Sequence, residues 1–383
     1  MDSTASERKN ARKIHIQRGS RFPMSESTMK AWRLDGMGGC LAFETVPKPV
    51  PRAGSVRVRI EASVLMSYLK PYVEGKLPFY RPPPAPFTPG TNGIGVIDAI
   101  GPDIWHLKPG QRVVLSSHFV AREQIDDPAQ ILIGLTGSEG AAPMLHDWPD
   151  GTLGEYALAP AEVVTPLDGL EDINAAQLAA ITRFVIPFGG LLRARLTAGE
   201  TIVVTGATGA YGSAAVLVAI AMGAARVVAT GRNQSSLDAL ARVAGPRVST
   251  VALSGDVQRD AEALRTAAGG GVPVAFDMVG QANDPNATLA ALHSLRRGGR
   301  LVLMGSMATD LPIPYTTVML NSLEILGQFM YPANAYQRLL ALVRSGLLDI
   351  HALTPREFAL AALDQAMHAA SDAGNLEYVV VRP

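Results

Sequence analysis

The sequence contains very little cysteine. Cys40 is the only cysteine in 383 residues, which excludes an intrachain disulfide framework and any zinc site built from four thiolates. A long chain without disulfides is compatible with a reducing compartment. We therefore expect a cytoplasmic location.

The sequence also lacks a surplus of charge of either sign. Its 34 Lys and Arg residues balance 34 Asp and Glu residues, and charged residues make up 18% of the chain. No strong electrostatic field is therefore available to attract nucleic acid or anionic lipid. We expect a small-molecule substrate as the partner, with no nucleic acid and no membrane.

Long hydrophobic runs are missing as well. The run from Ala214 to Met222 is well short of the ~20 residues that span a bilayer, and the N-terminus has no apolar signal core. Residues 1–23 are basic and polar without periodicity. We interpret them as a disordered leader or tag, with an organelle transit peptide as the alternative.

Apolar residues, by contrast, make up 48% of the chain, and its length predicts about two domains. Residues 24–167 contain short β-like runs broken by Gly and Pro, such as SVRVRIEASV, which predict an antiparallel, barrel-like domain. Residues 168–346 alternate strand-like and helix-like segments, a pattern that predicts a doubly wound parallel sheet. Residues 347–383 end in the strand-like YVVVRP and are expected to return to the first domain.

Three glycine-led turns follow predicted strands in the second half, at Gly206, Gly280 and Gly305. In an open parallel sheet, turns at the carboxyl ends of the strands line the crevice where ligands bind. We therefore expect these three turns to converge on one ligand.

The first turn, TGATGAYGS, resembles the dinucleotide-binding fingerprint, with Ala207, Gly209 and Gly212 at the three glycine positions. Gly209 allows the backbone to approach a pyrophosphate, and Gly212 allows the following helix to pack closely on the strand. A helix beginning near Ala210 would direct free N–H groups and its positive dipole end at the phosphates. Such a turn also arises for tight packing alone, but here both the strand and the helix are present.

The end of the second strand, ATGRN, indicates which nucleotide is bound. An Asp or Glu at this place would bind the ribose 2′-hydroxyl of NAD, but the first carboxylate after it is Asp238. Arg232 instead offers a planar cation suited to a 2′-phosphate, and Thr230 and Asn233 can add neutral hydrogen bonds. We therefore expect NADP(H), the alternative being that Arg232 is a solvated loop residue. The predicted cofactor contacts are Thr208, Gly209, Ala210, Tyr211, Gly212, Thr230, Gly231, Arg232, Asn233, Val279, Gly280, Gly305 and Ser306.

Taken together, these motifs resemble the medium-chain dehydrogenase/reductase superfamily, specifically its zinc-free quinone oxidoreductase-like branch. The resemblance runs from about Met29 to the C-terminus, and its carriers are PGTNGIGVIDAIGPDIWHLKPGQRVV, GTLGEYALAP, the dinucleotide turn, FDMVG and LRRGGRLVLMGS. It implies an α/β protein with a GroES-like β-barrel catalytic domain and a Rossmann doubly wound parallel sheet. It also implies an active site between the two domains.

Zinc-dependent members of this superfamily bind a catalytic metal through Cys, His and a second Cys or acid. By this resemblance, the corresponding positions of this chain are occupied by Leu65, by Thr91 with Asn92, and by Ile181 or Thr182. Because aliphatic side chains have no lone pair for zinc, the resemblance implies a site without a metal.

The same resemblance suggests the residues that transfer a proton. The relay positions of zinc-dependent relatives correspond to Ser67 and Lys70, and quinone reductase-like relatives often have a tyrosine nearby, here Tyr68 or Tyr72. Ser67, Tyr68 and Lys70 are the predicted catalytic residues, with Lys70 also able to reach a cofactor ribose or phosphate. The alternative is that Ser67 merely ends a strand, Lys70 is solvated and the tyrosines are packing residues.

Tyr72, Tyr80 and Asn92 are the predicted substrate contacts, although bracing of the turn at Gly93 is the favoured role of Asn92. RPPPAPFTPG is expected to be a stiff loop that carries an apolar wall of Phe79, Tyr80 and Phe87, with a polyproline ligand as the alternative. Asp277 at a strand end is expected to brace neighbouring backbone.

These residues predict a zinc-independent, NADPH-dependent oxidoreductase that transfers hydride to a quinone or an α,β-unsaturated carbonyl. The alternatives are a ketone or aldehyde reductase or alcohol dehydrogenase, and a non-catalytic NADPH-binding sensor. The apolar, strand-like LEILGQF near a sheet edge further predicts a homodimer.

Overall fold

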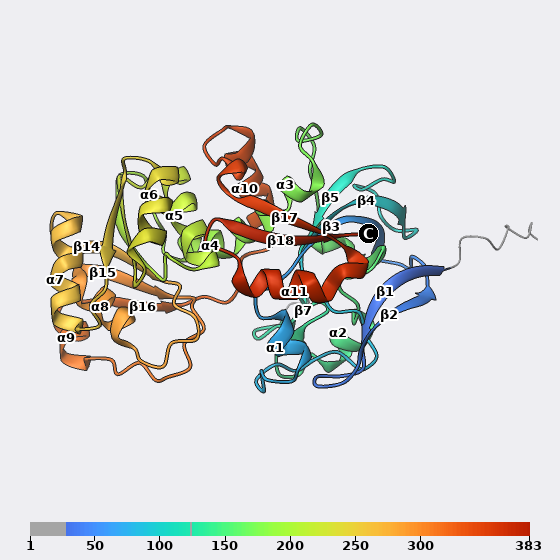
Figure 1. Cartoon of the computed structure of the whole chain (residues 1–383), viewed down its shortest axis with the longest axis horizontal. Coiled ribbons are helices and arrows are strands. Elements are labelled where there is room, and N and C mark those ends of the chain that lie inside the picture. Colours follow the sequence, from blue (N-terminus) through green and yellow to red (C-terminus); the bar gives the residue numbers. More distant parts are fainter. Residues whose placement is uncertain (1–27, 123–124) are drawn as a thin grey trace, which may run out of the picture.

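The computed structural model describes residues 28–122 and 125–383, so the predicted leader at residues 1–23 lies outside the described part. Two sheets with their own helices lie on either side of a central pair of helices (Figure 1). One sheet is wholly parallel and the other is largely antiparallel. The predicted fold class is confirmed.

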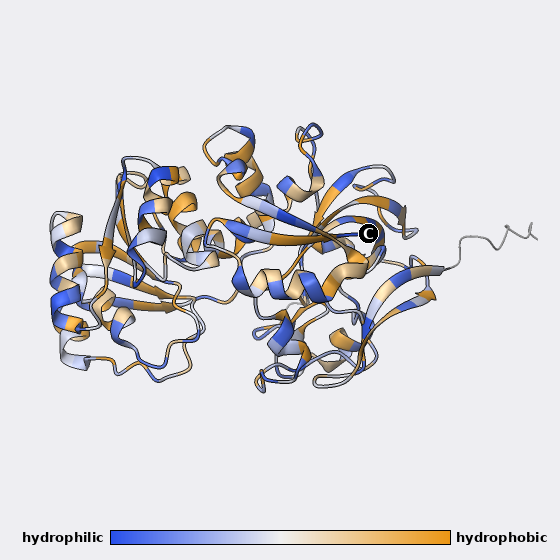
Figure 2. Cartoon of the chain, viewed as in Figure 1, coloured by the Kyte–Doolittle hydropathy of each residue, from blue (hydrophilic) through white to orange (hydrophobic). Residues whose placement is uncertain are grey.

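The parallel sheet contains six strands in the order β13-β12-β11-β14-β15-β16. The three central strands carry buried runs rich in valine, as expected for strands covered on both faces. The strands are β11 (Thr201–Thr205), β12 (Arg226–Gly231), β13 (Val248–Ala252), β14 (Val272–Asp277), β15 (Leu295–Leu303) and β16 (Glu324–Gly327). The helices that connect them are α5 (Ala210–Ala221), α6 (Gln234–Ala244), α7 (Val257–Ala268), α8 (Asn286–Ser294) and α9 (Tyr315–Leu320). This strand order is that of the dinucleotide-binding doubly wound sheet, and hydrophobic residues are concentrated on its strands (Figure 2).

The second sheet contains seven strands in the order β10-β5-β4-β3-β18-β17, with β9 also paired to β3. They are β3 (Ser55–Val64), β4 (Gly93–Ile100), β5 (Arg112–Leu115), β9 (Tyr156–Pro160), β10 (Val164–Pro166), β17 (Thr354–Ala359) and β18 (Glu377–Arg382). The C-terminal strand β18 thus pairs with β3, more than 300 residues earlier in the chain. The segment QRVVLSSHFV, which reads as one run in the sequence, is divided between β5 and a strand of a separate small sheet.

The remaining elements surround this second sheet. Two small sheets consist of β1 (Thr28–Leu34) with β2 (Leu41–Pro47), and of β6 (His118–Val120), β7 (Gln130–Leu132) and β8 (Thr136–Gly137). The helices are α1 (Leu69–Val73), α2 (Ala142–Asp147), α10 (Ala335–Arg344), α11 (Leu363–Asp372) and the short 3-10 turns Ala161–Val163, Ile350–Ala352 and Leu360–Ala362. Phe79, Tyr80 and Phe87, predicted to form one apolar wall, do not share one face, because Phe87 is fully buried whereas Phe79 is 76% exposed. The predicted wall was therefore wrong.

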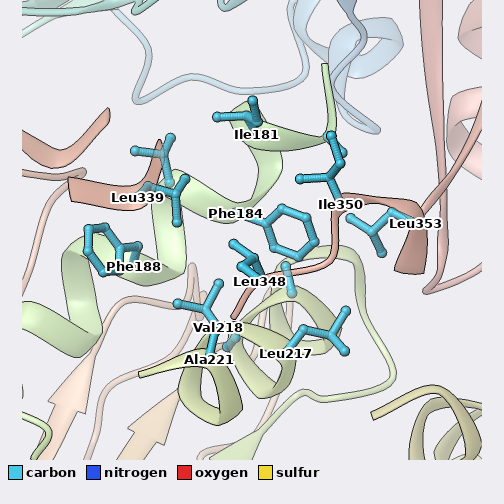
Figure 3. Close-up of a cluster of buried hydrophobic side chains, with 14 of the residues drawn as sticks. Ile181, Phe184, Phe188, Leu217, Val218, Ala221, Leu339, Leu348, Ile350 and Leu353 are labelled. Atoms are coloured by element: carbon cyan, nitrogen blue, oxygen red, sulfur yellow. The ribbon is translucent and has the colours of Figure 1, made fainter. Parts of the chain in front are cut away.

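Helices α3 (Ala175–Leu178) and α4 (Ala180–Arg193) join the two sheets. Their buried side chains share one continuous core with residues of β3, β4, α5 and α10. Figure 3 shows Phe184 of α4 between α5 and the segment from 348 to 353, and Phe188 of α4 beside Leu339 of α10. Residues 175–193 are long and apolar enough to cross a membrane. However, 89% of the apolar 18-residue stretch within them is buried inside the protein, as in a core helix.

Candidate functional site

The turn after β11 has the geometry of a phosphate-binding turn. Gly206 has a φ of +65°, a conformation that side chains other than glycine rarely adopt, and α5 begins at Ala210 with Gly209 as its N-cap. A Cβ atom at Gly212 would lie 2.0 Å from the Gly206 carbonyl oxygen. Gly212 is therefore required for the close packing of α5 on the turn, as predicted from the sequence.

The three glycine-led turns do converge at the carboxyl edge of the parallel sheet. A Cβ atom at Gly206 would lie 2.7 Å from the Met278 carbonyl oxygen, and one at Gly305 would lie 2.1 Å from that of Val279. Ser306 donates from its backbone nitrogen to the Val279 carbonyl at 3.1 Å and forms a parallel bridge with Gly280. The ends of β11, β14 and β15 therefore form one contiguous backbone surface.

Asp277 stabilises this edge from behind. It is buried, and its Oδ1 atom accepts hydrogen bonds from the Thr205 hydroxyl at 2.5 Å and the Thr288 hydroxyl at 2.9 Å. Burial raises the pKa of this carboxyl, while both hydroxyls oppose the shift. The expected bracing role thus acts through two side chains that link β11, β14 and α8.

The residues after β12 differ in what they can offer a 2′-phosphate. Arg232 and Asn233 are exposed, and Asn233 caps α6 by accepting from the Ser236 backbone nitrogen at 3.1 Å. Thr230, by contrast, is fully buried and its hydroxyl donates to the Val251 carbonyl at 2.8 Å. The prediction that the Thr230 side chain assists Arg232 is therefore corrected. The Thr208 side chain packs directly against Gly231, because a Cβ there would lie 2.7 Å from Thr208 Cγ2.

Tyr68, Tyr80 and Tyr211 form a group of phenols that joins the two halves of the protein. The Tyr68 and Tyr80 rings have centroids 6.1 Å apart, and Tyr211 belongs to the first turn of α5. Burial raises the pKa of Tyr68 well above its usual value, and the neighbouring Tyr211 and Tyr80 raise it further. Tyr68 therefore remains a protonated hydrogen-bond donor beside the dinucleotide turn.

Tyr72, a predicted substrate contact, has a different role. It is fully buried, and its hydroxyl donates to the Leu135 carbonyl at 2.6 Å. Its ring makes an edge-on contact with Tyr80, with centroids 5.6 Å apart. Tyr72 thus packs against Tyr80, and its hydroxyl is bound to the protein backbone.

Ser67 and Lys70 follow β3 around the start of α1. Ser67 is exposed. The Lys70 ammonium lies 3.0 Å from Nε2 of His368 on α11, and Nδ1 of His368 lies 2.7 Å from the Asp364 carbonyl. A ring that donates from Nδ1 accepts at Nε2, so Lys70 donates to His368. The structure thus pairs Lys70 with the C-terminal return and not with the dinucleotide turn.

The residues at the positions that correspond to the zinc ligands of zinc-dependent relatives do not form a set of side chains that could bind zinc. Leu65 and Ile181 are buried apolar residues, Thr91 offers only a hydroxyl, and the Thr182 hydroxyl donates to the Ala179 carbonyl at 2.8 Å. Within residues 28–122 and 125–383, no group of three or more His, Cys, Asp or Glu residues could hold a metal ion. Asn92 stabilises the segment between β5 and β6, because its Oδ1 atom accepts a hydrogen bond from the Ser117 backbone nitrogen at 2.7 Å.

Two features near these residues were not found from the sequence. Arg183 on α4 is 6% exposed and donates from Nε to the Ala210 carbonyl at 2.9 Å. The sequence feature that could have revealed Arg183 is a single arginine within the otherwise apolar segment AITRFVIPFGG. A second network joins Ser116 and His118, which follow β5, to Tyr331, which follows β16. Burial lowers the pKa of His118.

Comparisons with known proteins agree with this architecture. Residues 52–169 match the family described as alcohol dehydrogenase GroES-like domain, and residues 210–345 match the family described as zinc-binding dehydrogenase. A putative D-xylulose reductase of Agrobacterium fabrum is 30% identical over 90% of this chain and 94% of that protein. An alcohol dehydrogenase of a Moraxella species is 31% identical over 79% of this chain and 85% of that protein.

Solved structures show the same fold. The crystal structure of AibC superposes with a TM-score of 0.78 at 22% identity and covers 96% of this chain and 99% of its own. The arrangement of both sheets is therefore shared over nearly the whole described chain. The sequence relatives and the fold together identify the chain as a member of the medium-chain dehydrogenase/reductase superfamily, a family of oxidoreductases that use nicotinamide dinucleotides.

Proposed function

We propose that the protein is a metal-independent, NADPH-dependent oxidoreductase that transfers hydride to a quinone or an α,β-unsaturated carbonyl compound. One observation carries this proposal. The dinucleotide turn is intact, whereas Leu65, Thr91 and Ile181 occupy the positions that resemble zinc ligands. Conjugated acceptors suit such a site, because conjugation spreads the developing negative charge and a hydrogen-bond donor is sufficient in place of a Lewis acid.

The residues of the carboxyl edge fit a nicotinamide dinucleotide. Backbone N–H groups at the start of α5 would hold the pyrophosphate, the exposed Arg232 would contact the 2′-phosphate, and Val279, Gly280, Gly305 and Ser306 form the adjacent backbone surface. The bound cofactor supplies the hydride. The chain itself supplies position and hydrogen bonds.

Among the predicted catalytic residues, Tyr68 is the proposed proton donor. A phenol is protonated at neutral pH, the raised pKa of Tyr68 extends this state to alkaline pH, and its neighbour Tyr211 belongs to the first turn of α5. Tyr80, half-buried against Tyr68 and Tyr72, is the proposed substrate contact. Ser67 is an exposed second donor, and Lys70 with His368 provides a route for the proton toward solvent.

Interconversion of an alcohol and a ketone or aldehyde is the second candidate. It is favoured by the names of the relatives, a D-xylulose reductase and an alcohol dehydrogenase. These substrates lack the conjugation that disperses charge, so Tyr68 would have to stabilise an alkoxide unaided.

Turnover of NADPH and NADH against a panel of quinones, enones, ketones and polyols, with and without a strong chelator, tests both candidates. We expect oxidation of NADPH by quinones or enones, no effect of the chelator, and no stoichiometric zinc by elemental analysis. Turnover of polyols or ketones alone would favour the second candidate. One equivalent of tightly held zinc would refute the metal-independent mechanism, and dinucleotide binding without any turnover would indicate a sensor.

We further propose that residues 24–167 with 347–383 act as the catalytic domain and residues 168–346 as the cofactor domain of a cytoplasmic homodimer. The sharing of one sheet by β3 and β18 supports this division. An apolar, exposed helix at the end of the parallel sheet supports the dimer.

A further inference from the structure

Arg183 lies where the central helix α4 meets the dinucleotide turn. Its side chain is 6% exposed. The Nε atom donates to the carbonyl of Ala210, the first residue of α5, at 2.9 Å, and Nη1 donates to the carbonyl of Glu377 at the start of β18. The guanidinium is therefore held beside the N-terminus of α5 by two backbone oxygens.

The positive charge of Arg183 has no carboxylate partner among the described residues, since no Asp or Glu oxygen there lies within 4.0 Å. The Glu377 carboxylate instead lies 3.8 Å from Arg356. Burial lowers the pKa of Arg183 only to about 10, so the group is still a cation at neutral pH. A buried charge without a partner is costly, and an anion would offset this cost.

The N-terminus of α5 independently lacks an anion. This 12-residue helix has no side-chain cap and no acidic residue in its first turn. The backbone N–H groups of Tyr211 and Gly212 have no acceptor in the described part of the chain. A cation beside the positive end of a helix dipole is unfavourable, unless an anion lies between them.

We propose that Arg183 is the fixed counter-charge for the pyrophosphate of the bound dinucleotide, acting with the N–H groups of Tyr211 and Gly212. This inference rests on the proposed nicotinamide cofactor. The Nη2 atom of Arg183 makes no hydrogen bond to a described residue. It is also not one of the fully buried atoms without a partner in the described part of the chain, which are Ser117 Oγ and Tyr336 Oη. Nη2 is therefore the nitrogen left for a phosphate oxygen.

A purely structural role makes different predictions. Arg183 also ties α4 to α5 and to β18, and the Ser213 hydroxyl makes a parallel tie from α5 to the Asn375 carbonyl. If this tie were its whole role, substitution would lower stability and leave the affinity of the folded protein for dinucleotides unchanged.

The experiment measures binding to the full chain by titration calorimetry, using NADPH, NADH and inorganic pyrophosphate as probes. Arg183→Gln should weaken NADPH and NADH equally, by about ten- to hundredfold for a lost charge-assisted hydrogen bond. It should also abolish competition by pyrophosphate and reduce the salt dependence of binding. Arg232→Ala is the matched control, because loss of that cation should weaken NADPH alone.

Arg183→Lys covers the case in which the glutamine variant does not fold. Lysine keeps the charge and loses the planar fork, so it should lower the thermal midpoint while keeping dinucleotide affinity within about tenfold and retaining the salt dependence. Unchanged affinity in folded Arg183→Gln, or a loss of salt dependence in Arg183→Lys, would overturn the inference. If the unmodified protein bound no dinucleotide at all, the proposed function would fail as well, which separates the two failures.

Discussion

The Oγ atom of Ser116 lies 2.9 Å from the Oη atom of Tyr331. Ser116 follows β5 of the antiparallel sheet, whereas Tyr331 follows β16 of the parallel sheet, and both are buried. His118 strengthens the same junction, because its Nδ1 atom lies 3.2 Å from the Tyr331 carbonyl and its ring packs edge-on against the Tyr331 ring. This buried network connects the two halves of the molecule.

Tyr331→Phe tests the contribution of that junction. The change removes the hydroxyl and leaves the Ser116 side chain with two contacts to the His118 backbone, accepting from its nitrogen at 3.1 Å and donating to its carbonyl at 3.4 Å. We expect the free energy of unfolding to fall by about 1 kcal/mol, seen as a lower urea midpoint at an unchanged slope. Ser345→Ala is the control for the loss of one hydroxyl, because Ser345 is exposed and its hydroxyl donates only to the Leu342 carbonyl at 3.1 Å, at the end of its own helix. Equal midpoints for the two variants would show that the bond contributes nothing.

Tyr68→Phe tests the proposed proton donor. Loss of a general acid should lower turnover about a hundredfold or more and leave the dissociation constant of NADPH unchanged. Because burial, Tyr211 and Tyr80 all raise the Tyr68 pKa, the phenol keeps its proton as the pH rises from 7 to 9. We therefore expect no loss of turnover from this group across that range.

The control for Tyr68 is Tyr156→Phe, a matched loss of one phenol. Tyr156 stacks beneath Lys48, whose Nζ atom lies 3.7 Å from the ring centroid, and it lies on β9 opposite Arg59 of β3. Steady-state rates at saturating NADPH provide the measurement. If both variants lose turnover to the same extent, Tyr68 has no special role.

Arg232→Ala tests the choice between NADPH and NADH. A charge-assisted hydrogen bond to the 2′-phosphate contributes about 1.5 to 3 kcal/mol, so NADPH affinity should fall by about one to two orders of magnitude and NADH affinity should not change. Added salt should narrow the difference in the unmodified protein, because Arg232 is exposed. The measurement is fluorescence titration with both dinucleotides.

Arg259→Ala provides the charge-matched control for Arg232. Arg259 is also exposed but lies on α7, in the first turn after the Asp256 cap. It should leave both affinities unchanged. An equal loss of NADPH and NADH affinity in Arg232→Ala would mean that Arg232 does not recognise the 2′-phosphate.

The parts of the fold that follow local rules were predictable from the sequence. The apolar TIVV run, the required Gly212 and the start of α5 at Ala210 together define the turn. These features depend on residues a few positions apart, so their spacing in the sequence carries the information. The order of the parallel strands then follows from the resemblance of the whole chain to a known fold.

Side-chain partners that are distant in sequence were not predictable. Motif positions place Thr230 at a strand end and Tyr72 in a loop, but they do not reveal that their hydroxyls donate to Val251 and Leu135. Arg183 reaches Glu377 across 194 positions, and His118 reaches Tyr331 across 213. Only the packing of α4 and of the C-terminal return brings these groups together.

The last prediction concerns the exposed edge of the parallel sheet. Strand β16 ends the sheet, and its outer N–H and C=O groups are available for pairing with a second copy. The adjacent helix α9 has no buried residue, and two of its apolar side chains, Met319 and Leu320, are 53% and 61% exposed. Such an apolar patch beside a free edge strand is typical of an interaction surface, and a homodimer formed through β16 and α9 would cover both.

Light scattering at micromolar concentration should give a mass of about twice the 40.4 kDa of one chain. Leu320→Glu should convert this species to monomer, because a carboxylate would have to lose its water in an apolar interface. Leu347→Glu is the matched control, since Leu347 is also 61% exposed but follows α10, outside the edge formed by β16 and α9. It should leave the dimer intact. A monomeric mass for the unmodified protein, or dissociation of both variants alike, would show that this edge is not the interface.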